Sequence, residues 1–158
     1  MDNAKVEIKE TLKYGKAVFA KDKIFKGEII GAFHGETYEA PRAMLLPDEP
    51  PLRAGRHAIQ FERNKWRDGK VNGVARYIAH SCEPNCGIKN LFEVTAMRNI
   101  QAGEEITWDY AMTEDSDFRM KCECGTSACR GIIGAYSMLS PAIRQKYKGY
   151  ISEWLEPA

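Results

Sequence analysis

The sequence has no excess of charge of one sign, no long hydrophobic run and no even set of cysteines. Lysine and arginine number 23 against 22 aspartate and glutamate, so the formal net charge is +1. This balance argues against nucleic acid or an anionic membrane as the main partner. No stretch approaches the roughly 20 apolar residues of a membrane span, and residues 1–7 lack the apolar run of a signal peptide. We therefore expect an intracellular protein that does not enter a membrane.

The cysteine count, five, also argues against a disulfide framework, which needs an even number and a secreted context. Cys122, Cys124 and Cys129 share one short loop, in which Gly125 relieves the backbone. A tetrahedral zinc site needs a fourth ligand from elsewhere in the chain.

Two cysteines compete for the position of fourth ligand, Cys82 and Cys86, and we favour Cys82. The spare cysteine is expected in the core, because unpaired cysteines are among the most buried residues. His80 is a further candidate ligand or a catalytic base, but a histidine in a polar turn more often bonds a backbone carbonyl, which we expect here.

A chain of 158 residues fits one domain, and its short apolar runs separated by turn residues predict a mainly β (α+β) fold. Residues 38–56 form a proline-rich stretch expected to be a long surface loop with one helical turn at 43–46. The expected strands cover residues 17–20, 29–33, 57–61, 91–96 and 105–110. The expected turns lie at residues 26–28, 68–69, 72–73 and 101–104, the middle two being of the hairpin type.

A helix is expected after Ser140, because Ser140 is a good N-cap residue and Pro141 is a good first helical residue. Its apolar face would include Tyr147 and extend to Leu155, with Gly149 as its weak point. Tyr110 alone is most simply a half-buried strand tyrosine, and Gly15 most simply a turn glycine. The residue patterns alone therefore reach a zinc-stapled β-rich domain and stop short of a reaction.

Three stretches taken together resemble the SET-domain protein lysine methyltransferases. Residues 76–86, RYIAHSCEPNC, resemble the family's Arg-Phe-Ile-Asn-His-Ser-Cys-x-Pro-Asn-Cys, and residues 103–110, GEEITWDY, resemble its Gly-Glu-Glu-Leu-Thr-Phe-Asp-Tyr. Residues 122–131, CECGTSACRG, resemble its post-SET zinc loop. A fainter match, residues 14–20 with the turn at 26–28, lies where the family has its Gly-x-Gly strand entry.

The resemblance implies a SET fold of small twisted sheets with a pseudoknot, a zinc-stapled post-SET loop and a C-terminal helix. The segment ending at Tyr110 would thread beneath a loop. S-adenosylmethionine would bind on one face and a peptide in a groove on the other, with a narrow channel between them. The implied division is a SET domain at residues 1–118, the zinc loop at 119–134 and a helical extension at 135–158, all in one compact unit.

The resemblance also implies roles for single residues. Tyr110 would be the catalytic tyrosine, with Phe33 and Trp108 facing the lysine channel. The shared zinc site would be Cys82, Cys122, Cys124 and Cys129. The cofactor would contact the backbone of Gly15, Lys16 and Ala17, the pocket residues Arg76 and Tyr77, and the backbone of Ala79 and His80, which would bond the adenine.

Four positions depart from the family pattern. Ala17 replaces a glycine and Ala79 an asparagine, both among the expected cofactor contacts. Phe33 stands where a channel tyrosine is usual, and Trp108 replaces a phenylalanine or tyrosine.

The implied function is a protein-lysine N-methyltransferase that moves a methyl group from S-adenosylmethionine to a lysine of a histone or another protein. A sulfonium about 4 Å from the lysine ammonium repels it by roughly 4 kcal/mol at an effective dielectric near 20. This repulsion would lower the pKa of the lysine by about three units, so the amine needs no general base to lose its proton. Nucleic acid would be involved only indirectly, if the substrate is a histone. The location would be cytoplasmic in a prokaryote and nuclear if the substrate is chromatin.

The sequence is also compatible with two other functions. One is a SET-like module that binds a peptide or protein with weak or no turnover, which the departures from the family pattern would explain. The other is a zinc-stabilised structural protein that binds no cofactor.

Overall fold

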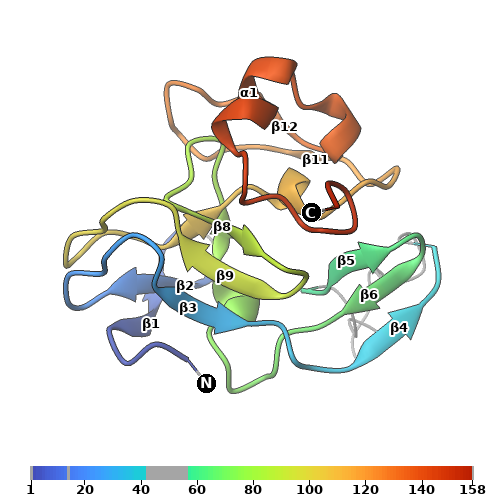
Figure 1. Ribbon diagram of the computed structural model, residues 1–158. Helices are drawn as coiled ribbons and strands as arrows, with labels where there is room; N and C mark the ends of the chain where they lie inside the picture. The colour runs from blue at the N-terminus through green and yellow to red at the C-terminus, as the bar shows by residue number, and fades with distance from the viewer. Residues whose placement is uncertain (1, 14, 42–56, 158) are drawn as a thin grey trace.

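The computed structural model describes residues 2–13, 15–41 and 57–157. Within these residues the chain is mainly β, with short strands and few helical turns (Figure 1). The strands are β1 (Val6–Thr11), β2 (Gly15–Ala20), β3 (Ile29–Ala32), β4 (Thr37–Glu39), β5 (Ile59–Glu62), β6 (Lys65–Arg67), β7 (Ala79–His80), β8 (Cys86–Lys89), β9 (Glu93–Ala96), β10 (Thr107–Trp108), β11 (Met120–Lys121) and β12 (Ile132–Ile133). The helical elements are the 3-10 turns η2 (Ala75–Tyr77), η3 (Tyr110–Met112) and η4 (Tyr136–Met138) and the α-helix α1 (Pro141–Lys146).

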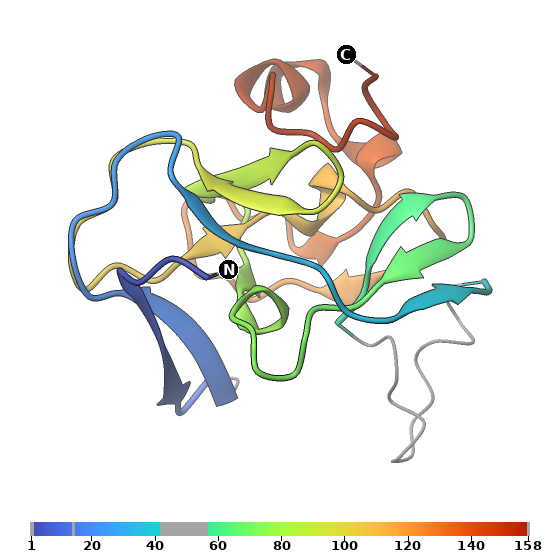
Figure 2. The same cartoon turned by 60° about the horizontal axis from the view of Figure 1, so that its bottom comes forward.

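The strands of the described residues form five small sheets, two of three strands and three of two strands. The orders are β3-β9-β8, β4-β6-β5, β1-β2, β11-β12 and the parallel pair β7-β10. Figures 1 and 2 show the C-terminal segment, including α1, on one side of the β3-β9-β8 sheet, while the β4-β6-β5 sheet stands beside it. The expected mainly β fold with several small sheets and a C-terminal helix is confirmed.

One hydrophobic core joins the central sheet to the C-terminal segment. Ile88 and Val94 from the sheet are fully buried, and Tyr147 and Ile151 from the C-terminal segment belong to the same cluster. Burying a large aliphatic or aromatic side chain stabilises the fold by about 1.5–3 kcal/mol. The C-terminal segment is therefore part of the domain's core.

The C-terminal helix is much shorter than predicted. Ser140 accepts the backbone N–H of Ile143 as an N-cap, as expected, but α1 ends at Lys146. Gly149 adopts a positive φ of 86°, which a continuing right-handed helix does not allow. The chain then turns back toward the sheet, where the carbonyl of Tyr150 accepts the N–H of Ile88 at 2.9 Å. The apolar spacing after residue 146 therefore reflects packing of a non-helical segment.

The structure has the turn expected at 72–73, where the N–H of Gly73 donates to the carbonyl of Lys70 at 2.9 Å, but this turn does not join two paired strands. The hairpin turn expected at 68–69 is wrong, because these residues form no turn. The β5-β6 hairpin instead turns at Arg63 and Asn64, and Asn64 has a positive φ of 57°, which asparagine tolerates better than most residues. Residues 69–74 lead from β6 into η2.

The strand expected at 17–20 is confirmed within β2, but β2 pairs with β1, and β3 pairs with β9. The expected strands at 29–33, 57–61 and 91–96 correspond to β3, β5 and β9, whose ends differ from the expected ones by at most two residues. The loop expected at 38–56 begins with part of β4, and its residues 42–56, including the expected helical turn, lie outside the described residues.

The strand predicted at 105–110 is only two residues long, β10. It pairs in parallel with β7, and Asn85 holds it from the other side, because its side chain accepts the N–H of Thr107 at 3.0 Å and donates to the carbonyl of Glu105 at 2.8 Å. The segment that ends at Tyr110 is thus held against the turn at 80–86, which a pseudoknot requires. No helix among the described residues is long and apolar enough to cross a lipid bilayer.

Candidate active site

Tyr110 begins a 3-10 turn and is not a strand residue. The turn forms because the Asp109 carboxylate accepts the backbone N–H of Ala111 at 3.0 Å, as an N-cap residue does. The Tyr110 hydroxyl donates to the carbonyl of Ile78 at 2.7 Å. This bond fixes the position of the hydroxyl oxygen beside η2.

Phe33, Trp108 and Tyr110 form one aromatic cluster. The Trp108 ring lies between the other two, with centroid distances of 6.1 Å to Phe33 and 4.9 Å to Tyr110. Phe33 is 2% exposed and Trp108 3% exposed, so water is excluded from this side of the Tyr110 ring. The buried indole Nε1 of Trp108 has no hydrogen-bond partner among the described residues.

His80 is a neutral histidine whose proton position follows from its contacts. Burial lowers its pKa to about 4, although the nearby Asp109 carboxylate acts to raise it. Its Nδ1 accepts the backbone N–H of Tyr110 at 3.1 Å, which leaves the proton on Nε2, 3.5 Å from the Cys82 sulfur. The 3.6 Å separation of Nδ1 from an Asp109 oxygen is then a contact between two acceptors and not an ion pair. The ring does bond backbone, but it accepts from an N–H group, whereas we expected a bond to a carbonyl.

The structure brings together the four cysteines named from the sequence. The sulfur atoms of Cys82, Cys122, Cys124 and Cys129 all lie within 4.8 Å of one another, and those of Cys82 and Cys122 are 3.7 Å apart. In a tetrahedral zinc site with Zn–S bonds of about 2.3 Å, neighbouring sulfurs are about 3.8 Å apart. The donor set and its spacing therefore fit zinc.

The surroundings shift the pKa values of three thiols of this cluster. Burial raises the pKa of Cys82, and it raises the pKa of Cys122 to about 12. Burial also acts to raise the pKa of Cys124, but hydrogen bonds, led by that of the Thr126 hydroxyl, lower it to about 6. A divalent cation bound by the cluster would stabilise the thiolate forms of Cys82 and Cys122.

Cys86, the alternative ligand, lies away from this cluster. It begins β8, is fully buried and belongs to the main core, and burial raises its pKa far above the usual range. It is therefore the spare core cysteine that we expected.

Two of the expected cofactor residues, Lys16 and Arg76, lie near the Tyr77 ring. The Lys16 ammonium lies 5.4 Å and the Arg76 guanidinium carbon 5.7 Å from the centre of the Tyr77 ring. Arg76 also lies 3.9 Å from the Asp68 carboxylate, and its buried Nε has no partner among the described residues. Gly15, at the start of β2, has a positive φ of 77°, and Ala17, two residues later, is fully buried.

The backbone N–H and carbonyl of His80, in β7, do not take part in the pairing with β10. The N–H of Ser81 donates to the carbonyl of Trp108 at 3.1 Å, and in a parallel pair a strand bonds its partner through alternate residues. The backbone groups of His80 therefore point away from β10, whereas those of Ala79 are on the β10 side. A cavity of about 360 Å³ lies beside His80, and Lys13, Cys124 and Thr126 are among the residues that line it.

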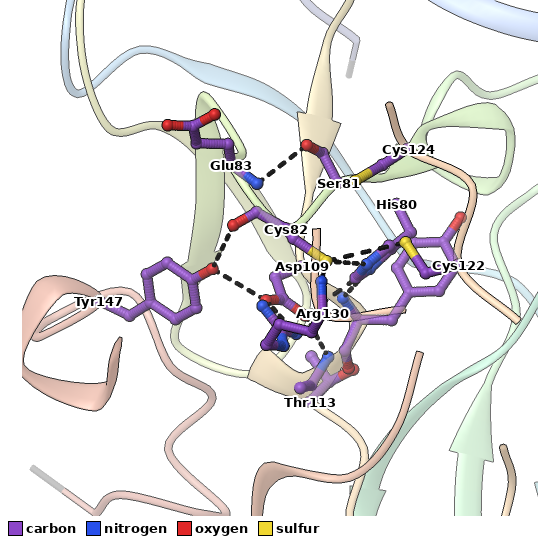
Figure 3. Close-up of polar contacts among 12 residues, drawn as sticks. His80, Ser81, Cys82, Glu83, Asp109, Thr113, Cys122, Cys124, Arg130 and Tyr147 are labelled. Atoms are coloured by element: carbon purple, nitrogen blue, oxygen red, sulfur yellow. Dashed lines mark hydrogen bonds and ion pairs between the residues drawn. The ribbon is translucent and has the colours of Figure 1, made fainter. Parts of the chain in front are cut away.

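Sequence reasoning missed the contacts of Asp109, which is fully buried directly before Tyr110. Arg130 and Tyr147 reach its carboxylate from the cysteine loop and from the end of α1 (Figure 3). The sequence places Asp109 next to Tyr110 and Arg130 next to Cys129. It does not show that Asp109 and Arg130 are in contact, because this contact depends on the tertiary fold.

Comparison with known proteins agrees with this geometry. The SET domain family matches residues 15–111, which include β2, β7, β10 and Tyr110. The chain belongs to the SET-domain family.

Curated relatives of this SET domain include histone-lysine N-methyltransferases. An H3 lysine-4 specific enzyme of Aspergillus oryzae is 40% identical over 129 residues, which cover 73% of this chain and 10% of the relative. An H3 lysine-36 specific enzyme of Mycosarcoma maydis is 31% identical over 139 residues, or 82% of this chain and 14% of the relative. The chain thus spans a small part of the length of the curated relatives it matches.

The fold is also similar to that of solved SET-domain structures. A crystal structure of KRYPTONITE with mCHG DNA and SAH has a TM-score of 0.62 at 24% identity, covering 81% of this chain and 28% of that one. A second KRYPTONITE structure, with mCHH DNA, an H3(1-15) peptide and SAH, has the same TM-score at 23% identity, covering 81% of this chain and 29% of that one. At this level of identity the likeness establishes the SET fold.

Proposed function

We propose that this SET domain is an S-adenosylmethionine-dependent protein-lysine N-methyltransferase. The observation that carries the proposal is the position of the Tyr110 hydroxyl, which is fixed by the Ile78 carbonyl at 2.7 Å beside the buried aromatic ring of Trp108. The relatives named as histone-lysine N-methyltransferases support the same reaction.

The cofactor would lie against β7 and η2. The backbone N–H and carbonyl of His80, which point away from β10, fit the hydrogen-bonding edge of an adenine, and the cavity beside His80 offers space for it. Lys16, Arg76 and Tyr77 would line the remaining part of the site, together with the backbone of Gly15 and Ala17. The backbone of Ala79 is used by β10, so we drop it as an adenine contact and keep the small side chain as a lining group.

When bound, S-adenosylmethionine supplies a methyl group on a positively charged sulfur. The chain's own residues would orient the acceptor. The Tyr110 hydroxyl and the Ile78 carbonyl would align the lysine amine, and Phe33 and Trp108 would exclude water from its methylene chain. Catalysis of this kind needs alignment in a dry channel and no acid–base pair.

Zinc would be held by Cys82, Cys122, Cys124 and Cys129 and would tie the cysteine loop to the turn that follows β7. We also propose the division into a SET domain at 1–118, a zinc loop at 119–134 and an extension at 135–158. The shared core residues Tyr147 and Ile151 support one compact unit.

The substrate would be a protein or peptide with an accessible lysine. The histone specificity of the named relatives makes a histone the first substrate to test, and a histone substrate would place the reaction on chromatin in the nucleus. DNA would then be a neighbour of the substrate and not a ligand of this domain.

The proposal is tested with purified protein, S-adenosylmethionine and an array of lysine-containing peptides that includes the histone tails. We expect calorimetric binding of the cofactor and transfer of its methyl group to a defined set of lysines. Binding of a peptide without transfer would replace the enzyme with a binding module. Absence of cofactor binding by zinc-loaded protein would leave a zinc-stabilised structural protein.

A further inference from the structure

Asp109 is a fully buried carboxylate directly before Tyr110. A buried charge is costly unless it is paired and hydrogen-bonded, so its partners are strongly constrained. One oxygen, Oδ2, accepts from the Arg130 guanidinium at 2.7 Å and from the Tyr147 hydroxyl at 2.8 Å (Figure 3). The other oxygen, Oδ1, accepts the N–H of Ala111.

These donors come from three separate segments of the chain. Arg130 follows the last cysteine of the zinc loop, and its backbone N–H donates to the sulfur of Cys82 at 3.3 Å. Its guanidinium therefore reaches Asp109 from a backbone that is already attached to the cysteine cluster. Tyr147, 1% exposed, comes from the end of α1.

Asp109 in turn sets the orientation of Tyr110. Its carboxylate caps the 3-10 turn that Tyr110 begins, and this turn aims the Tyr110 hydroxyl at the Ile78 carbonyl. A rotation of Asp109 would release the cap on this turn. The carboxylate is thus the point at which the zinc loop and the C-terminal segment can act on the tyrosine.

We propose that Arg130 and Tyr147 are positioning residues that hold Asp109, and through it Tyr110, in the reactive orientation once the cysteine loop has docked. The inference rests on the proposed role of Tyr110. Tyr147 lies outside the matched SET region at 15–111. The inference therefore means that the segment after the zinc loop affects the reaction rate through Asp109.

The test compares Arg130→Met, Arg130→Lys and Tyr147→Phe with the wild type in zinc-loaded protein. We expect Arg130→Met to lower kcat by about 10- to 100-fold, because a buried hydrogen bond to a charged group is lost. Arg130→Lys should recover part of this loss, and Tyr147→Phe should lower kcat by about tenfold, the effect of one hydrogen bond. Zinc content, cofactor affinity and the KM for peptide should be unchanged in each.

Two control variants match the substitutions in residue type. Arg119→Met removes an exposed arginine of the same region that bonds the carbonyls of Ser116 and Phe118, and Tyr150→Phe removes a hydroxyl near the same end of α1. Both should keep the wild-type kcat.

A second readout does not depend on activity. In protein labelled with 3-fluorotyrosine, the ¹⁹F resonance of Tyr110 is assigned by its loss in Tyr110→Phe. We expect it to shift or broaden in Arg130→Met and Tyr147→Phe, and to stay unchanged in Arg119→Met.

The outcomes separate this inference from the proposed function. A wild type that methylates no lysine peptide contradicts the function, whereas the ¹⁹F shift still tests the positioning. An Arg130→Met variant with wild-type kcat and an unshifted resonance overturns the inference alone. Loss of zinc from Arg130→Met also overturns it for Arg130, since the arginine would then serve only the folding of the loop.

Discussion

The sulfur atoms of Cys82 and Cys122 lie 3.7 Å apart although the two residues come from different segments of the fold. We predict that one zinc ion binds per chain and bridges these segments. Cys124→Ser should remove the zinc, loosen the loop and abolish methyl transfer, while folding of residues 1–110 partly survives. Metal analysis of protein purified without a chelator measures the stoichiometry.

The fifth cysteine provides the control for this prediction. Cys86→Ala should cost stability, because Cys86 is fully buried in the core, but should leave the zinc content at one ion per chain. A Cys82→Ser variant that retains full zinc content and activity would show that the fourth ligand is wrongly assigned.

Burial, followed by the charge of Asp109, raises the pKa of Tyr147 above the usual value of about 10. Because the pKa of Tyr147 is higher in the folded state than in the unfolded state, Tyr147 contributes fully to the free energy of unfolding below a pH of about 10. This contribution is lost as the pH rises toward the folded-state pKa. Above that pH the free energy of unfolding should fall more steeply for the wild type than for Tyr147→Phe, by at most about 1.4 kcal/mol per pH unit.

Urea unfolding at several pH values between 9 and about 11.5 measures this difference. Subtracting the Tyr147→Phe values from those of the wild type removes the contribution of the other tyrosines. Parallel curves for the two proteins would show that Tyr147 titrates as a solvent-exposed tyrosine does.

Trp108 should limit the number of methyl groups added to one lysine. Its ring lies 4.9 Å from that of Tyr110, and its bulk would fill space that a dimethyl-lysine needs. A steric clash of a buried ring costs about 1–3 kcal/mol, against about 1 kcal/mol for one net hydrogen bond, so bulk should outweigh the missing hydroxyl of Phe33. We expect mono- or dimethylation by the wild type.

Trp108→Phe should shift the products toward trimethyl-lysine, and mass spectrometry of a methylated peptide measures the distribution. Trp66→Phe is the matched control, because Trp66 is equally buried but belongs to the separate small core beside β4. Trimethyl-lysine as the main wild-type product would contradict the role of Trp108.

The cysteine cluster could be predicted because thiolate ligation depends on few residue types at short spacing, and three of the four cysteines are near neighbours in sequence. The strand β2 was predictable for a similar reason, since its apolar residues are contiguous. The end of α1 was not, because the apolar spacing continues to Leu155 while Gly149 adopts a left-handed conformation that periodicity does not reveal.

The surroundings of Tyr110 show the same limit at the site. The residue pattern placed Tyr110 as the last residue of a strand, but Tyr110 begins a 3-10 turn that depends on the cap by Asp109. The partner of its hydroxyl is a backbone carbonyl, which every residue type offers. The meeting of Asp109, Arg130 and Tyr147 required chain segments far apart in sequence to be placed side by side. Residue patterns describe such contacts only after the fold is known.

The Tyr110 hydroxyl is proposed to align a lysine amine for methyl transfer. The single-turnover rate of methyl transfer from labelled S-adenosylmethionine to a lysine peptide, compared between the wild type and Tyr110→Phe, measures this role. We predict a loss of about 100-fold or more in Tyr110→Phe, as for removal of one preorganised donor, with cofactor affinity within about threefold. A Tyr110→Phe rate equal to that of the wild type would contradict this role and return Tyr110 to a structural one.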